Sequence, residues 1–217
     1  MTDKYYITTP IYYVNDKPHI GHAYTSVATD FIARFMRLKG HDVRFQTGTD
    51  EHGLKIQKAA ESKGKEPLEL CDENSRIFRD LTTTLDLSND DFIRTTEQRH
   101  IDGASFLWNR LHERNQIYLG EYTGWYSIND ETFYNEKDLV KQSDGSFKTV
   151  TGGPVDWISE KSYFFKLSEW SGKLLDLYKK NPDFISPRSK KNEVIKFVET
   201  GLNDLSVSRT SFNWGIK

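Results

Sequence analysis

The sequence predicts an α/β fold in which an open parallel sheet is followed by a smaller unit that also contains strands. The first fifty residues have the pattern of a strand, a helix and a second strand, and the crossover is long enough for a parallel pair. Two further stretches have helical spacing of apolar residues. After about residue 120 the chain changes to short aromatic runs separated by glycines, which is typical of strands and turns.

The opening elements follow from residue type and spacing. Residues 5–14 are rich in β-branched and aromatic side chains, and Pro10 marks the point where strand pairing should stop. A helix of about four or five turns is expected after Pro18, and Gly40 should end it. Residues 42–47 read as the second strand. The apolar positions that predict the helix are Tyr24, Val27, Ala28, Phe31, Ile32 and Phe35.

The later helices are predicted in the same way, and two of them are expected to cover the sheet. The sheet-covering pair is predicted from Cys71, Asn74, Phe78, Leu81 and Leu85, and from Ala104, Leu107, Trp108 and Leu111. Helical spacing returns over residues 167–178, stops at Asn181-Pro182 and resumes over residues 194–202. We place the domain boundary near residue 114, with one domain over 1–113 and the second over 114–217.

Composition limits the class of protein. Thirty Lys and Arg against 32 Asp and Glu give a formal charge of −2, which indicates no particular partner, and 13% aromatic residues argue against disorder or a fibre. The single cysteine, Cys71, excludes an internal disulfide and any zinc site that needs two thiolates from this chain. No apolar run approaches a membrane span and no targeting pattern begins the chain. Cytoplasm is therefore the expected location, and the mitochondrial matrix is the second option.

The first candidate site is the segment His19-Ile-Gly-His22 between the first strand and its helix. Open α/β sheets bind ligands beyond the carboxyl ends of their strands. A helix start offers free N–H groups and a favourable dipole to an anion, imidazoles add donors, and Gly21 permits a flat base to approach the backbone. The alternative is that both histidines are solvated or capping side chains in a helix-entry turn.

The second candidate site is the segment Thr47-Gly-Thr-Asp-Glu-His-Gly53, where the second strand should meet the same crevice. A carboxylate such as Asp50 could bind an ammonium group there, and the pair would matter more in a partly dry cleft than on an open surface. The alternative is that Asp50 caps the next helix. We assign no specific role to the neighbouring Glu51, His52 and Lys55.

These segments together resemble the class I aminoacyl-tRNA synthetases, and within them the methionyl-tRNA synthetases. The residues His19 to His22 match the His-Ile-Gly-His signature of the class. The methionyl group is indicated by three further segments, and the likeness runs through essentially the whole chain. They are Ile7-Thr-Thr-Pro-Ile-Tyr-Tyr13, Thr47-Gly-Thr-Asp-Glu-His-Gly53, and Leu205-Ser-Val-Ser-Arg-Thr210 with Trp214-Gly-Ile216.

The resemblance implies the first half of a Rossmann-like nucleotide-binding domain followed by an α+β connective-peptide insert. It implies activation of methionine by ATP, with Mg²⁺, to methionyl-adenylate, and transfer of the aminoacyl group to the acceptor end of tRNA(Met). By analogy, His19 and His22 contact the ATP phosphates as catalytic groups, and Gly21 passes beneath the adenine. In the methionine site, Asp50 holds the α-ammonium, and the site is bounded by Pro10, Ile11 and Tyr13.

Two departures from the family pattern stand out. Many members bind zinc in the insert through cysteines, which Ser127 and Asp130 replace here, so we expect no zinc and a metal-free type similar to alphaproteobacterial and some mitochondrial versions. Aromatic packing should hold the insert instead. The aromatic residues expected to pack there are Trp125, Tyr126, Phe133, Tyr134, Trp157, Phe164 and Phe165. The Lys-Met-Ser-Lys-Ser loop of the family is also absent, so we expect an amino-terminal part of a longer enzyme that is inactive or severely impaired alone.

Other interpretations stay open. Arg188, Lys190 and Lys191 form the densest basic cluster, which is either a tRNA contact or a solvated helix entry. The parent could be another class I synthetase, of the valine or isoleucine type, with cysteine disfavoured because its enzyme needs thiolate-bound zinc. It could also be a non-catalytic module that binds tRNA or a protein. A small-molecule adenylyltransferase is disfavoured by the long insert.

Overall fold

The computed structural model describes residues 3–127, 130, 132–210 and 212–217, and these divide into two compact units. The parallel-sheet unit contains residues 3–105, Asp130 and residues 212–217, and the antiparallel-sheet unit contains residues 106–127 and 132–210. The division falls inside helix α4 (Gln98–Glu113), whereas the sequence placed the boundary at the end of this helix. We describe each unit by itself.

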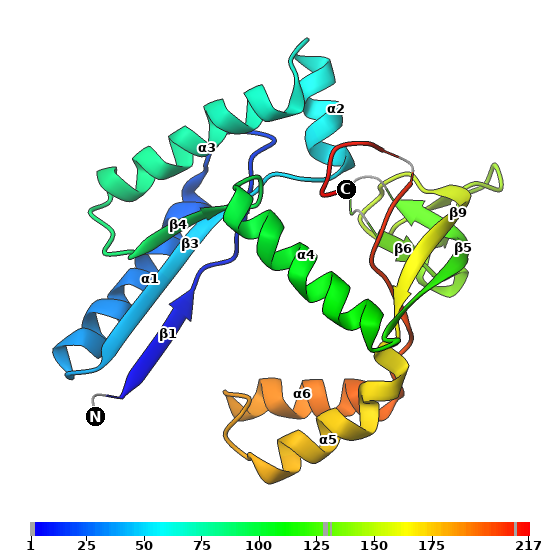
Figure 1. Ribbon diagram of the computed structural model, residues 1–217. Coiled ribbons are helices and arrows are strands. Elements are labelled where there is room, and N and C mark those ends of the chain that lie inside the picture. Colours follow the sequence, from blue (N-terminus) through cyan, green and yellow to red (C-terminus); the bar gives the residue numbers. More distant parts are fainter. Residues whose placement is uncertain (1–2, 128–129, 131, 211) are drawn as a thin grey trace. The chain divides into compact units, whose positions relative to one another are not determined.

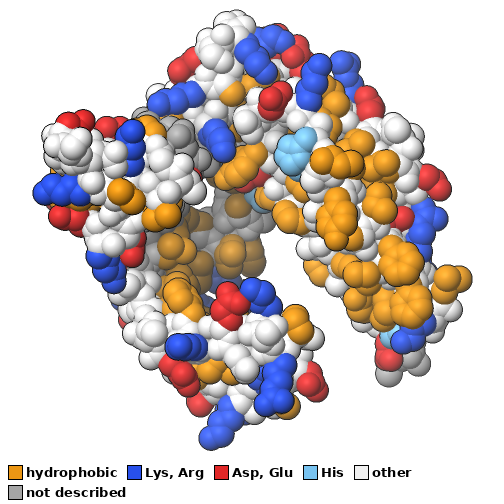
Figure 2. Space-filling view, turned by 180° about the vertical axis from the view of Figure 1, so that it is seen from behind, with side chains coloured by type: hydrophobic (Ala, Val, Ile, Leu, Met, Phe, Trp, Pro, Cys, Tyr) orange, Lys and Arg blue, Asp and Glu red, His pale blue; other side chains and the backbone are white. Residues whose placement is uncertain are grey.

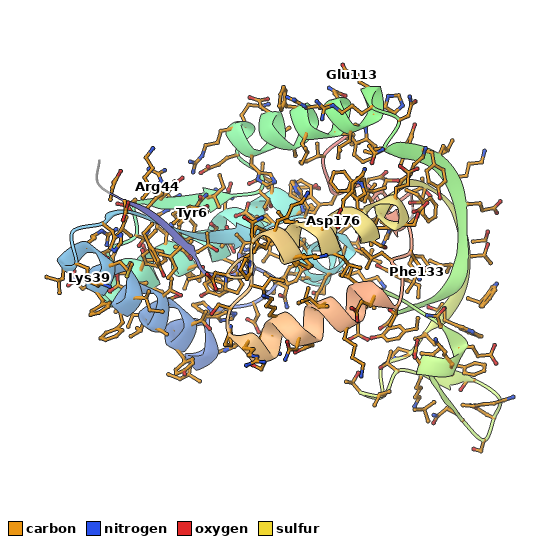
Figure 3. The ribbon with its side chains drawn as sticks, turned by 90° about the horizontal axis from the view of Figure 1, so that it is seen from below. Tyr6, Lys39, Arg44, Glu113, Phe133 and Asp176 are labelled. Carbon is orange, nitrogen blue, oxygen red and sulfur yellow. The ribbon has the colours of Figure 1, made fainter. Side chains whose placement is uncertain are left out.

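The parallel-sheet unit confirms the predicted α/β class. Strand β3 (Asp42–Asp50) lies in the middle, with β4 (Asp91–Arg94) on one edge and with β1 (Lys4–Thr8) and β2 (Tyr12–Tyr13) in succession on the other. All of these pairings are parallel, as the arrows of β1 and β3 show (Figure 1). Paired residues share a face of the sheet, as Tyr6 and Arg44 do (Figure 3).

Two backbone features shape this sheet. Pro10 has no N–H to donate, and pairing with β3 stops between β1 and β2 as the sequence predicts. Gly48 lets β4 approach β3 closely, because a Cβ at this position would lie 2.0 Å from the carbonyl oxygen of Ile93. Strand β4 was not predicted, because its four residues are too few to show an alternating pattern.

Three helices of this unit are α1 (Ile20–Leu38), α2 (Leu54–Ser62) and α3 (Pro67–Thr84). Helices α1 and α3 confirm two of the predicted helices, and α3 covers the sheet as expected by burying Cys71 and Phe78. The prediction that α4 also covers the sheet is wrong, because none of its described residues is buried. Its Trp108 instead packs edge-on against Tyr163 in the antiparallel-sheet unit, with the ring centroids 5.3 Å apart.

Helix α1 buries its less apolar side. Its buried residues are Ser26, Thr29, Asp30 and Ala33, whereas the apolar stripe that predicted the helix faces outward, with Phe31 71% exposed. Hydrophobic side chains gather accordingly on the face of this unit seen in Figure 2. The periodicity therefore located the helix, although it did not identify the buried side. Among the described residues no helix is long and apolar enough to cross a bilayer.

The antiparallel-sheet unit is built on four strands in the order β10-β9-β5-β6. They are β5 (Ile117–Ser127), β6 (Thr132–Tyr134), β9 (Asp156–Phe165) and β10 (Leu205–Ser206), and the small hairpin of β7 (Val140–Lys141) and β8 (Phe147–Lys148) follows β6. Short 3-10 turns occupy Glu136–Asp138 and Leu167–Trp170. The predicted helical pair is confirmed as α5 (Ser171–Lys180) and α6 (Arg188–Glu199).

Candidate functional site

The two histidines of the His-Ile-Gly-His segment cap helix α1 together. The His19 Nδ1 accepts a hydrogen bond from the Gly21 N–H at 3.0 Å, and the His22 Nδ1 accepts one from the His19 N–H at 3.0 Å. The two ring centroids lie 3.8 Å apart. This is a reciprocal capping box built from imidazoles, so the helix-entry alternative correctly described what their Nδ1 atoms do.

The same bonds determine what the histidines can offer a ligand. A neutral imidazole whose Nδ1 accepts a hydrogen bond carries its proton on Nε2, so each ring presents one Nε2–H donor. Burial, and next the charge of His19, lower the pKa of His22, which keeps its Nδ1 available as an acceptor near neutral pH. Two donors at a helix start, where the helix dipole favours negative charge, make a favourable position for phosphate oxygens.

Gly21 has a steric reason to lack a side chain. A Cβ at this position would lie 2.9 Å from Cε1 of the His19 ring. Any other residue would therefore displace the imidazole that caps the helix. The glycine matters for the position of the neighbouring ring, in addition to the close approach of a base that the sequence suggested.

Strand β2 connects the histidines with Asp50. Tyr12 points inward: its ring centroid lies 4.8 Å from that of His22, and its hydroxyl is 2.9 Å from the Ser26 Oγ. Tyr13 is 41% exposed and pairs in register with Asp50, the half-buried last residue of β3. The Lys55 Nζ lies 5.5 Å from the centre of the Tyr13 ring. Adjacent residues of one short strand thus adjoin both predicted sites.

Pro10 and Ile11 form the exposed step between β1 and β2. The Thr9 hydroxyl donates to the Pro10 carbonyl oxygen at 2.8 Å, which holds this step in place. Ile11 is 41% exposed and lines an open pocket of about 270 Å³. The other lining residues are Tyr6, Thr8, Thr9, Gln46, Thr47 and Ile93.

Glu51, to which the sequence analysis assigned no role, is fully buried. Its carboxylate accepts hydrogen bonds from the Arg94 Nε at 2.8 Å and Nη2 at 2.9 Å, and from the Thr49 hydroxyl at 2.7 Å. The Thr96 hydroxyl donates a further bond. Arg94 also pairs with Asp72 of α3 at 2.6 Å. The sequence signal for a role of Glu51 was a charged residue directly after a buried strand. Its partner Arg94, 43 residues away, could not be identified from that signal.

The turn that follows Glu51 is held from several sides. The Trp214 indole N–H and the Cys71 thiol both donate to the Glu51 carbonyl oxygen, and the Gly53 N–H donates to the Trp214 carbonyl oxygen at 3.2 Å. Burial raises the pKa of Cys71 to about 12, so the thiol stays protonated as this donor requires. Burial also lowers the pKa of His52, whose ring centroid lies 5.5 Å from that of Trp214.

Other candidate groups were a metal site and the basic cluster of α6. Within the described residues, no three His, Cys, Asp or Glu side chains are grouped so as to hold a metal ion. In α6, the Lys190 Nζ pairs with Glu193 at 2.7 Å, and the Lys191 Nζ donates to the Pro182 carbonyl oxygen at 2.5 Å. These contacts agree with the helix-entry interpretation of the cluster.

Comparison with known proteins shows the family. The family model described as tRNA synthetases class I (M) matches residues 5–144 and 145–217. The methionine–tRNA ligases of Rickettsia bellii and Mesorhizobium japonicum are 58% and 52% identical to the chain. The alignments cover 100% and 99% of the chain, but only 42% of each relative.

Solved structures give the same result. The chain superposes with a TM-score of 0.94 and 50% identity on the Mycobacterium tuberculosis methionyl-tRNA synthetase in complex with methionyl-adenylate, covering 100% of this chain and 42% of that one. The apo form of the same synthetase matches with a TM-score of 0.79 and 46% identity. The chain therefore belongs to the class I (M) family of tRNA synthetases, and it spans about 42% of the length of the relatives it matches.

Proposed function

We propose that the intact protein activates methionine with ATP and transfers it to the acceptor end of tRNA(Met). The observation that carries this proposal is the pair of imidazoles at the start of α1, each held through Nδ1 by a backbone N–H so that both Nε2–H groups are available. The methionyl-adenylate in the similar M. tuberculosis structure supports the choice of substrates. The cytoplasm is the location that this function fits.

In the first step, a carboxylate oxygen of methionine attacks the α-phosphorus of ATP. A new P–O bond forms to the carboxylate, the bond to the bridging oxygen breaks, and pyrophosphate leaves with that electron pair. His19 and His22 donate hydrogen bonds to phosphate oxygens where negative charge builds up, and Gly21 leaves room for the adenine. Mg²⁺ would enter with the ATP and offset the charge of the phosphates.

The methionine site in this proposal lies around β2 and the end of β3. Asp50 accepts hydrogen bonds from the α-ammonium, and Tyr13, its partner in register, bounds the site beside it. Pro10 and Ile11 form the wall at the exposed step between β1 and β2. In the second step, a ribose hydroxyl at the end of tRNA attacks the methionyl carbonyl carbon and AMP leaves. Positioning and charge stabilisation carry both steps, without a covalent enzyme intermediate.

We also propose that the antiparallel-sheet unit folds without zinc, as in the alphaproteobacterial type that the sequence suggests. Ser127, where many family members have a cysteine, is fully buried, and Asp130 is exposed. The Trp125 ring packs on Phe147 and Trp157, at centroid distances of 4.8 and 5.2 Å. If this packing replaces a metal, the intact protein should contain no stoichiometric zinc, and a chelator should leave its thermal midpoint unchanged.

The decisive experiment is methionine-dependent ATP–pyrophosphate exchange by the intact protein, followed by aminoacylation of tRNA. We expect methionine to support exchange far better than valine or isoleucine. Faster exchange with either of these would assign the protein to another synthetase. An absence of exchange with all amino acids, together with retained tRNA or protein binding, would favour the non-catalytic module.

A further inference from the structure

The Glu51–Arg94 pair is an unusual feature of the parallel-sheet unit, because burying a charge is costly unless it is fully paired. Glu51 has no exposed surface, and its carboxylate receives two bonds from one guanidinium and two from hydroxyls. The hydrogen bonds that Arg94 donates to Glu51 raise the pKa of this arginine above its usual value. Buried ion pairs often add little net stability compared with apolar residues of the same volume. Stability alone is thus a weak reason for this pair.

The backbone around Glu51 is fixed as firmly as its side chain. The Glu51 N–H donates to the Thr95 hydroxyl at 2.9 Å, and its carbonyl oxygen accepts from Trp214 and Cys71. Hydrogen bonds therefore hold the peptide groups on both sides of Glu51. The peptide group on its N-terminal side is the one that joins it to Asp50. On the other edge of β3, Asp50 is held by its register with Tyr13.

Arg94 connects this anchor with two further elements. It is the last residue of β4, and its Nη2 also pairs with Asp72 of α3 at 2.6 Å. The carboxyl ends of β3 and β4 and one side of α3 thus meet at one guanidinium. Because a guanidinium donates in a planar fork, the pair fixes orientation as well as distance.

We infer that Glu51, clamped by Arg94, is a positioning residue that holds the end of β3 so that Asp50 meets the ammonium group of methionine. Glu51 itself touches no substrate, because its carboxylate is turned into the protein. The inference rests on the proposed function, and it assigns a role to a fully buried carboxylate that this function does not use.

The test uses Glu51→Gln in the intact protein, with methionine-dependent pyrophosphate exchange as the assay. The amide has nearly the same shape but lacks the charge, and its NH₂ group would face donors of Arg94 or Thr96. We expect the KM for methionine to rise about tenfold to a hundredfold, as is typical when a supporting partner of a binding residue is lost, with the KM for ATP unchanged.

The matched control is Asp30→Asn. Asp30 is also a buried carboxylate of this unit, and it is held by Arg34 at 2.7 Å and by the N–H and hydroxyl of Ser88, but it does not contact the turn at 51–53. Its replacement should lower the thermal midpoint and leave the KM for methionine unchanged. If Glu51→Gln behaves like this control, Glu51 is only a structural residue and the inference fails.

A double-mutant cycle with Asp50→Asn tests whether Glu51 acts through Asp50. If it does, adding Glu51→Gln to Asp50→Asn raises the KM for methionine little further, so the two effects are strongly non-additive. If the double variant instead raises the KM for methionine by the product of the two single fold-changes, the inference is overturned. Should Glu51→Gln fail to fold, Arg94→Lys replaces it, since the lysine keeps the charge but cannot make the fork. It should raise the same KM in the same way, and an unchanged KM would overturn the inference.

These outcomes separate the inference from the function on which it rests. A wild-type protein without methionine-dependent exchange would end the proposed function and the inference together. An active wild type with no coupling between residues 50 and 51 would end the inference alone.

Discussion

The two units of the chain differ in whether they bury carboxylates. Among the described residues, the buried carboxylates are Asp30 and Glu51, and both belong to the parallel-sheet unit. Buried hydroxyls occur in both units, for example at Thr49 in the parallel-sheet unit and at Ser127 and Ser162 in the antiparallel-sheet unit. A carboxylate needs several donors from fixed directions, whereas a hydroxyl can both donate and accept and can rotate. Groups that demand fixed geometry thus occur in the unit that holds the candidate site.

The two units also differ in where their aromatic rings lie relative to the candidate site. In the antiparallel-sheet unit, Arg209 lies over the rings of Tyr126 and Phe133, at 5.8 and 5.3 Å, and these rings pack on each other. In the parallel-sheet unit, the rings of Tyr12 and His22 belong to the site itself. If the comparison is correct, substitutions at the candidate site of the parallel-sheet unit should change activity more than stability, and substitutions in the antiparallel-sheet unit should do the reverse.

The largest effect is expected at His19. Replacing it with Asn removes the Nε2–H donor but keeps a residue that caps helices well, so the exchange rate should fall about a hundredfold while the fold is retained. His19→Ala loses the donor and the cap, and should in addition reduce the free energy of unfolding by about 1 kcal/mol. Exchange kinetics and chemical denaturation measure the two effects. A full rate for the Asn variant would mean that His19 only caps the helix.

A smaller effect on rate is expected from Gly21→Ala, compared with Gly103→Ala in α4. The new methyl at residue 21 would press on the His19 ring, whereas a Cβ at residue 103 meets nothing within 4 Å. Both changes favour the helix by up to about 1 kcal/mol, but only the first should lower the exchange rate, by about tenfold or more. Equal activity of the two variants would show that the ring position is unimportant.

In the antiparallel-sheet unit, Ser162→Ala should act on stability alone. The Ser162 Oγ lies 2.6 Å from that of Ser206 and donates to the Ser208 carbonyl oxygen at 2.9 Å, so its loss should cost about 1 kcal/mol of unfolding free energy. The control Ser159→Ala removes an exposed hydroxyl that bonds Glu121, and should cost close to nothing. A raised KM for methionine in Ser162→Ala would contradict the separation of roles.

The smallest effect concerns pH. Burial lowers the pKa of His22 and His52, so the unfolded chain takes up these protons first as the pH falls below 6.5. These two histidines therefore cost no stability above that pH and reduce it progressively below. Thermal midpoints across this range should fall, and His52→Gln should flatten the fall. Replacing the exposed His112 of α4 in the same way serves as the control and should leave the slope unchanged.

Much of the fold was predictable because its signals are local. The strand, helix and strand of the first fifty residues were predicted from residue type and spacing, and Pro10 and Gly40 correctly marked two ends. Strand β4 and helix α2 were missed, since a run of four residues and one of nine show too little periodicity. The residues of the candidate site were named from motifs, and their proposed roles await the experiments above.

The sequence by itself determined that two histidines stand at a helix start and that an acidic residue ends the neighbouring strand, because turn, cap and strand signals lie within a few residues of each other. The tertiary structure alone decided which side of α1 is buried, that Glu51 turns inward to Arg94, and that Trp214 closes on the turn at 51–53. Each of these depends on a partner distant along the chain, and the choice of partner follows from packing and from the need to satisfy buried polar groups.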